Sequence, residues 1–123
     1  MSPSTLSNIK QLFQTKSQMT NDVIESYINL LKYYKKGMWI YPGVIKRKLN
    51  IPISDVYESL GYLENQKIVC SYFELYCNNC QRSMGDVFES FNEIPDEFEC
   101  EVCHGVFSGL ENTILIYKVI IDD

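Results

Sequence analysis

Two Cys-x-x-Cys pairs limit what this chain of 123 residues can fold into more than any other feature does. The first is Cys77-Asn-Asn-Cys80, the second is Cys100-Glu-Val-Cys103, and 19 residues lie between them. A zinc ion in a structural site takes four ligands in tetrahedral geometry, and each pair presents two thiolates to one ion. The spacing is typical of four-cysteine zinc sites. We therefore predict one structural zinc ion held by Cys77, Cys80, Cys100 and Cys103, with each pair forming a knuckle at a strand end.

Two alternatives to this ligand set are reactive dithiols and a site in which the single histidine is a ligand. Two reactive dithiols would replace the metal only in a thioredoxin-like βαβ context, which the sequence does not offer. His104 directly follows the last cysteine and is a rival fourth ligand, whereas Cys70 lies among apolar residues and is interpreted as core. Asn78, Asn79 and Gly105 are expected to give the two turns their left-handed backbone. Four protein ligands leave no open coordination position, so we expect the site to stabilise the fold and not to catalyse.

Hydrophobic periodicity predicts helices throughout the first half of the chain. The first is short and amphipathic, and because an isolated helix of that length is marginal in water, it has to pack on this domain or on a second chain. Pro42 suits the first position of a later helix, and Asn50 can end it. The last helix has Ser54 as its expected N-cap and buries a stripe that includes Ile53 and Leu60. The predicted helices cover residues 4–16, 21–36, 42–49 and 54–66.

Two segments rich in Ile, Val, Phe and Tyr predict strands at residues 67–76 and 113–121, on either side of the cysteine pairs. Together with the helices and a short extended stretch at 38–41, they predict an α+β fold. We expect three parts: an N-terminal amphipathic helix at residues 1–20, a three-helix domain with a β hairpin at 21–76 plus 113–121, and a zinc ribbon inserted at 77–112.

The stretch YPGVIKRKLNIPISDVYESLGYLENQKIV, from Tyr41 to Val69, carries a short helix, a turn with proline, a longer helix and the start of a strand. This order resembles the helix-turn-helix core of winged-helix domains, in which a β hairpin forms the wing. The resemblance implies DNA binding through the helix at 54–66, and it puts the zinc ribbon at the tip of the wing. A winged helix accompanied by a zinc ribbon also resembles general transcription factor E at the level of architecture.

Charge divides the chain into a basic and an acidic half. Residues 1–67 carry nine Lys and Arg against five Asp and Glu, whereas residues 68–123 carry two against eleven. The free face of the helix at 54–66 bears carboxylates and no Lys or Arg, which disfavours contact with phosphates. DNA would likewise repel the acidic half. Lys46, Arg47 and Lys48 in the basic half are either ordinary solvated side chains or a nucleic-acid-binding surface.

These features favour a non-enzymatic adaptor, a zinc-stabilised winged helix that docks on other proteins, one of them with a basic surface. The expected contact residues are Glu58, Gly61 and Tyr62 on the last helix and Glu93, Asp96 and Glu97 in the zinc ribbon. The alternative is a transcriptional regulator, or a component of the transcription machinery, that binds DNA through its basic half as a homodimer joined by the N-terminal helix. An enzyme subunit or toxin is less favoured, because no known catalytic motif can be assembled.

The sequence also carries expectations about location. No apolar run approaches the roughly 18 residues of a membrane span, and the first residues lack the pattern of a signal peptide. Five cysteines, an odd number, indicate reduced thiols and a metal instead of disulfides. We therefore expect a cytoplasmic protein that does not contact membranes.

Overall fold

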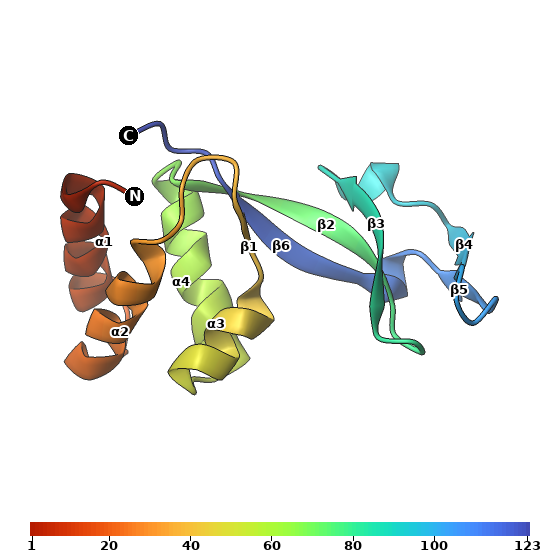
Figure 1. Ribbon diagram of the computed structural model, residues 1–123, viewed down its shortest axis with the longest axis horizontal. Coiled ribbons are helices and arrows are strands. Elements are labelled where there is room, and N and C mark those ends of the chain that lie inside the picture. Colours follow the sequence, from red (N-terminus) through yellow and green to blue (C-terminus); the bar gives the residue numbers. More distant parts are fainter. The chain divides into compact units, whose positions relative to one another are not determined.

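The computed structural model describes residues 1–123 and confirms the predicted α+β class (Figure 1). One sheet has four strands in the order β1-β6-β2-β3, and a second sheet pairs β4 with β5. No helix is long and apolar enough to span a bilayer. The chain divides into two compact units, one made of Met1–Cys70 with Tyr117–Asp123, the other of Ser71–Ile116.

Local sequence signals explain most helix boundaries in the first unit. The Ser2 hydroxyl accepts from the Thr5 amide at 3.2 Å and caps α1, and the Thr20 hydroxyl caps α2 in the same way. Asn50 adopts the left-handed conformation (φ 54°) that ends α3, as predicted. The four helices are α1 (Pro3–Lys16), α2 (Asn21–Leu31), α3 (Pro42–Leu49) and α4 (Ile53–Asn65).

Two predicted helix ends are wrong. The second helix stops at Leu31 and not at residue 36, because the next amides, of Tyr33 and Tyr34, turn back to carbonyls only three residues earlier. The fourth helix begins at Ile53 after Pro52, so Ser54 is not its N-cap, and Ile53 itself is exposed.

The core of the first unit joins α1 to the rest of the helices. Ile9 and Phe13 of α1 are fully buried, and the Phe13 ring lies 5.0 Å from the ring of Tyr27 in α2. The Tyr27 hydroxyl is paired with the Ser59 hydroxyl of α4 at 2.7 Å, and burial raises the pKa of Tyr27 well above its ordinary value. The first helix therefore packs on its own chain, and a homodimer through it stays a prediction.

Short strands and turns make up the second unit, apart from the two strands that lead into and out of it. The strand β2 (Val69–Cys77) pairs antiparallel with β3 (Arg82–Phe88), which the sequence did not predict. The β4 and β5 strands form an antiparallel hairpin, and β6 (Thr113–Val119) returns to pair with β1 (Trp39–Ile40). The remaining elements are η1 (Phe91–Glu93), β4 (Glu97–Glu99), β5 (Val106–Ser108) and η2 (Leu110–Asn112).

Replacing Phe13 with alanine tests whether α1 belongs to the core. Because the ring is fully buried, Phe13→Ala should lower the free energy of unfolding by about 3–5 kcal/mol in urea titrations. The exposed neighbour Gln14 supplies the control, since Gln14→Ala should change stability by less than about 0.5 kcal/mol. Equal stability of the two variants would mean that α1 does not pack as described.

Candidate metal centre

The four cysteines of the two Cys-x-x-Cys pairs come together in the second unit. Their sulfur atoms all lie within 4.8 Å of one another, and none of them forms a disulfide. Cys77 ends β2 and Cys100 follows β4, and both side chains are buried, whereas Cys80 and Cys103 are half-buried. Each pair lies in the turn of a β hairpin, the first between β2 and β3 and the second between β4 and β5. The arrangement is a possible metal site.

The two turns have the same backbone hydrogen bonds. The amide of the second cysteine donates to the sulfur of the first, at 3.4 Å in one pair and 3.5 Å in the other. The amide of the following residue donates to the carbonyl of the first cysteine, at 2.7 Å from Gln81 and 2.9 Å from His104. An amide aimed at sulfur favours a thiolate over a thiol, and each turn directs one such amide at its first cysteine.

Left-handed backbone occurs in both turns, but not at the residues that the sequence suggested. The positive φ angles belong to Gln81 (58°) and His104 (61°), which follow the second cysteine of each pair, and not to the two asparagines or to Gly105. The turn closes on the residue after each pair, so that position must turn left-handed whatever its side chain. Gly105 is needed for a different reason, because a Cβ there would lie 2.6 Å from the ring of Phe107.

The thiols differ in how easily they lose a proton. A backbone hydrogen bond from Gly105 is the main cause that lowers the pKa of Cys103 to about 6, and a backbone hydrogen bond from Cys103 lowers the pKa of Cys100. The hydrogen bond to Cys103, followed by burial, raises the pKa of Cys80 to about 12. Four thiolates so close together repel one another, so a cation is required to deprotonate the whole group near neutral pH.

Neither His104, the rival fourth ligand, nor Cys70 belongs to the cluster. The His104 side chain is 75% exposed, and its Nδ1 lies 3.8 Å from a carboxylate oxygen of Glu99. Cys70 is half-buried and lies outside the group of four sulfur atoms. The four-cysteine set is therefore the one that the fold brings together.

Asn112 supports the first turn, although no local sequence pattern indicates this role. Its buried side chain accepts from the Asn78 amide at 3.2 Å and donates to the Ser108 carbonyl at 2.8 Å. The Asn78 side chain donates in turn to the carbonyl of Glu111 at 2.8 Å. These bonds tie the first turn to the segment that follows β5, so both hairpins are held at the cluster.

The second unit carries an excess of negative charge. Residues 71–116 contain nine Asp and Glu and one Arg, and Glu74 is the only buried carboxylate among them. Glu93, Asp96 and Glu97, the predicted contact residues, are all exposed. One Glu93 carboxylate oxygen accepts from the Glu89 amide at 2.9 Å, which leaves the other free.

The predicted contact face on α4 is partly occupied by the chain itself. Glu58 is exposed, whereas Gly61 and Tyr62 are half-buried. The Tyr62 hydroxyl lies within hydrogen-bonding distance of the Lys16 carbonyl (3.1 Å) and the Glu58 carboxylate (2.5 Å). The C-terminal end of α1 thus contacts this face, which was predicted to be free for a partner.

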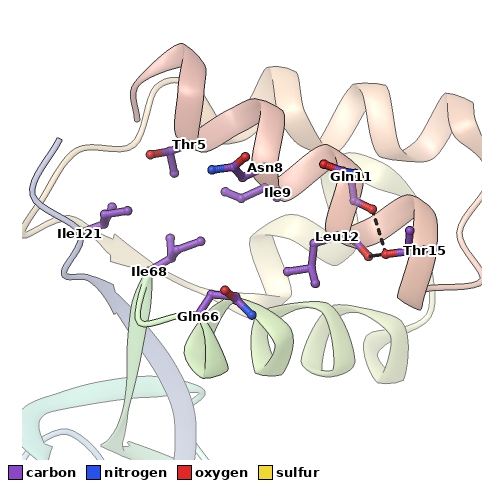
Figure 2. A pocket seen from close by; sticks show the side chains of 9 residues that line it. All are labelled: Thr5, Asn8, Ile9, Gln11, Leu12, Thr15, Gln66, Ile68 and Ile121. Atoms are coloured by element: carbon purple, nitrogen blue, oxygen red, sulfur yellow. Dashed lines mark hydrogen bonds between the residues drawn. The ribbon is translucent and has the colours of Figure 1, made fainter.

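A groove of about 410 Å³ lies in the helical unit, where side chains from α1, the end of α4 and the C-terminal segment converge (Figure 2). Its lining includes Ile9, Leu12, Ile68 and Ile121, together with uncharged amide and hydroxyl side chains. None of the lining residues is ionisable, so the groove supplies no acid, base or metal ligand. Lys46, Arg47 and Lys48 are exposed on α3 and do not line it.

Adjacent substitutions in the second turn should have opposite effects. A side chain is strained at the left-handed backbone of position 104, and glycine is not. His104→Gly should therefore stabilise the metal-loaded protein by about 1 kcal/mol. Gly105→Ala should destabilise it by about 1–3 kcal/mol, because the added methyl group overlaps the Phe107 ring. Thermal unfolding at matched metal content measures both, and the same sign for the two variants would contradict this turn geometry.

Comparison with protein-family models, curated proteins and solved structures found no match to this chain. The cluster offers four sulfur atoms as metal ligands, and no His, Asp or Glu belongs to the group.

Proposed function

We propose that the second unit is a zinc ribbon that holds one structural Zn²⁺ ion through Cys77, Cys80, Cys100 and Cys103. The observation that carries the proposal is the spacing of the sulfur atoms. Sulfur atoms at about 2.3 Å from one tetrahedral zinc ion lie about 3.8 Å apart. The Cys77–Cys103 and Cys80–Cys100 sulfur pairs are 3.9 Å and 3.6 Å apart, far longer than a disulfide bond.

A structural role for the ion fits the small size of the second unit. Its buried apolar side chains are few: Leu75, Ile94 and Ile116, in addition to two of the cysteines. The β4 and β5 strands have three residues each. Hairpins this short are marginal in water without further support. With four protein ligands the ion has no position for water or substrate, so its binding energy goes into folding.

Mutation of single cysteines tests the zinc site. The purified chain should carry one zinc ion by metal analysis and native mass spectrometry, and Cys100→Ser should lose it because three thiolates no longer close the tetrahedron. Cys70→Ser is the matched control and should keep the ion, since Cys70 lies outside the cluster. Zinc retained in Cys100→Ser, or lost in Cys70→Ser, would contradict the ligand set.

The first unit supports the winged-helix part of the proposal by the order of its elements. The α2, β1, α3 and α4 elements are followed by β2, and β6 lies between β1 and β2 in the sheet. A winged helix has this order, with β2 and β6 as the arms of the wing. Residues 78–112 lie between those two strands in the sequence, so they would extend the wing.

The whole chain would then act as a non-enzymatic adaptor that docks on a protein with a basic surface. The support is the excess of exposed carboxylates in the second unit, which includes Glu93, Asp96 and Glu97. A bound ion does not remove this charge, because four thiolates and one Zn²⁺ keep a formal charge of −2. Glu58, Gly61 and Tyr62 are a weaker part of the proposal, since α1 contacts that face.

Charge reversal tests the docking surface with a fluorescent deca-lysine peptide as the probe. Reversing Glu93, Asp96 and Glu97 to lysine should weaken binding at least about tenfold in anisotropy titrations, because like charges then meet across the contact. Reversing Asp22, Glu25 and Asp122 changes the net charge equally but lies in the other unit. Equal weakening by both triple variants would mean that net charge alone explains the binding, and it would contradict the proposed surface.

DNA binding through the exposed Lys46, Arg47 and Lys48 of α3 is the alternative function. It would appear in the same titrations as salt-dependent binding of a generic duplex, at roughly 10⁻⁴ to 10⁻⁶ M. Loss of that binding on reversal of the three basic residues, with deca-lysine not bound, would replace the adaptor proposal.

A further inference from the structure

We infer that the outer face of the β4–β5 hairpin is the centre of the docking surface, and that it binds a protein segment in which an aliphatic residue lies between two Lys or Arg residues. The inference deepens the proposed function and rests on it. The docking surface would then have an aliphatic centre as well as an acidic rim.

The hairpin pairing defines this face. Glu99 lies directly opposite Val106, and Glu97 lies opposite Ser108, so these four side chains share one side of the hairpin. The Phe98 and Phe107 rings, 5.9 Å apart, occupy the other side and are half-buried. The side with Glu97, Glu99 and Val106 therefore faces solvent.

Two aliphatic side chains are exposed at the cysteine end of this hairpin. Val106 is 64% exposed and Val102, in the turn between the strands, is 52% exposed. The Cys100 amide donates to the Gly105 carbonyl at 2.9 Å and closes the turn, so Val102 lies at its tip and Val106 one residue beyond its base. We call Glu97, Glu99, Glu101, Val102 and Val106 the hairpin patch.

The cysteines and the backbone hydrogen bonds hold the turn, so the turn does not require an aliphatic side chain at Val102. An apolar centre inside a charged rim is instead the usual build of a protein contact surface. Leu110 is also exposed, but it lies in η2, outside the β4–β5 hairpin.

Charge decides which partner fits the hairpin patch. Its three carboxylates are exposed, and Arg82 is the only Lys or Arg in the second unit. The Nδ1 atom of His104 lies 3.8 Å from a carboxylate oxygen of Glu99. A partner must therefore bring its own cations to Glu97, Glu99 and Glu101. An aliphatic side chain between those cations would cover Val102 and Val106, and it adds contact that charge alone does not supply.

Two labelled nonapeptides of equal charge test this inference on the zinc-loaded chain. One repeats Lys-Ser-Ile-Ser and ends in Lys, so its Lys and Ile side chains share one side when extended. The other has Ser in place of each Ile. The first should bind about tenfold more tightly in anisotropy titrations, the size of effect expected for an aliphatic anchor at a contact centre.

Protein variants locate the site of that preference. Val106→Ser and Val102→Ser should each remove most of the tenfold difference, with zinc content unchanged. Val87→Ser is the control, because Val87 is an exposed valine on β3, outside the hairpin patch. The Val87→Ser variant should keep the difference.

The possible failures are distinct. Equal binding of the two peptides, or a preference that survives in both patch variants, would overturn the aliphatic centre while leaving acidic docking intact. Absence of binding by either peptide, and by deca-lysine, would overturn the inference together with the proposed function.

Discussion

The approach of four cysteine sulfurs from two separate hairpins is the constraint on which the second unit depends. Each Cys-x-x-Cys pair forms the turn of one hairpin, and the Asn78 and Asn112 side chains join the first turn to the segment after the second hairpin. The strands themselves bury little apolar area. A single ion at this point would fix two loops whose closure otherwise costs conformational entropy, and this explains how so short a segment can hold a defined surface.

The helical unit depends on a different interaction. Ile9, Phe13 and Tyr27 are fully buried, and the hydroxyl of Tyr27 reaches Ser59 within the core. Because a buried hydroxyl without a partner is costly, this pair fixes how α2 lies against α4 as well as filling space. Apolar packing needs no ion, so removal of the proposed metal should act first on the second unit.

Much of the fold follows from local signals in the sequence. Pro42 and Asn50 mark the two ends of α3, and the cysteine spacing identifies all four members of the cluster. The β3 strand was missed because its sequence, RSMGDVF, has a left-handed Gly85 and a bulge opposite β2 in place of regular alternation. The left-handed Gln81 and His104 were missed because turn closure, and not side-chain preference, sets their backbone. Contacts between distant segments, such as Tyr62 with Lys16, have no local signature.

In the docking that we propose, the exposed valines of the hairpin patch would bear on specificity more than the carboxylates do. Exposed charges act over a Debye length of about 8 Å at physiological salt, and they mainly raise the rate at which any cationic partner arrives. They distinguish poorly between one basic segment and another. Val102 and Val106 contribute only when an aliphatic side chain covers them at close range, which slows dissociation of the matching segment alone. Because both valines lie at the cysteine end of the hairpin, this short-range contact would depend on the proposed metal site, whereas carboxylates elsewhere in the unit would attract cations in its absence as well.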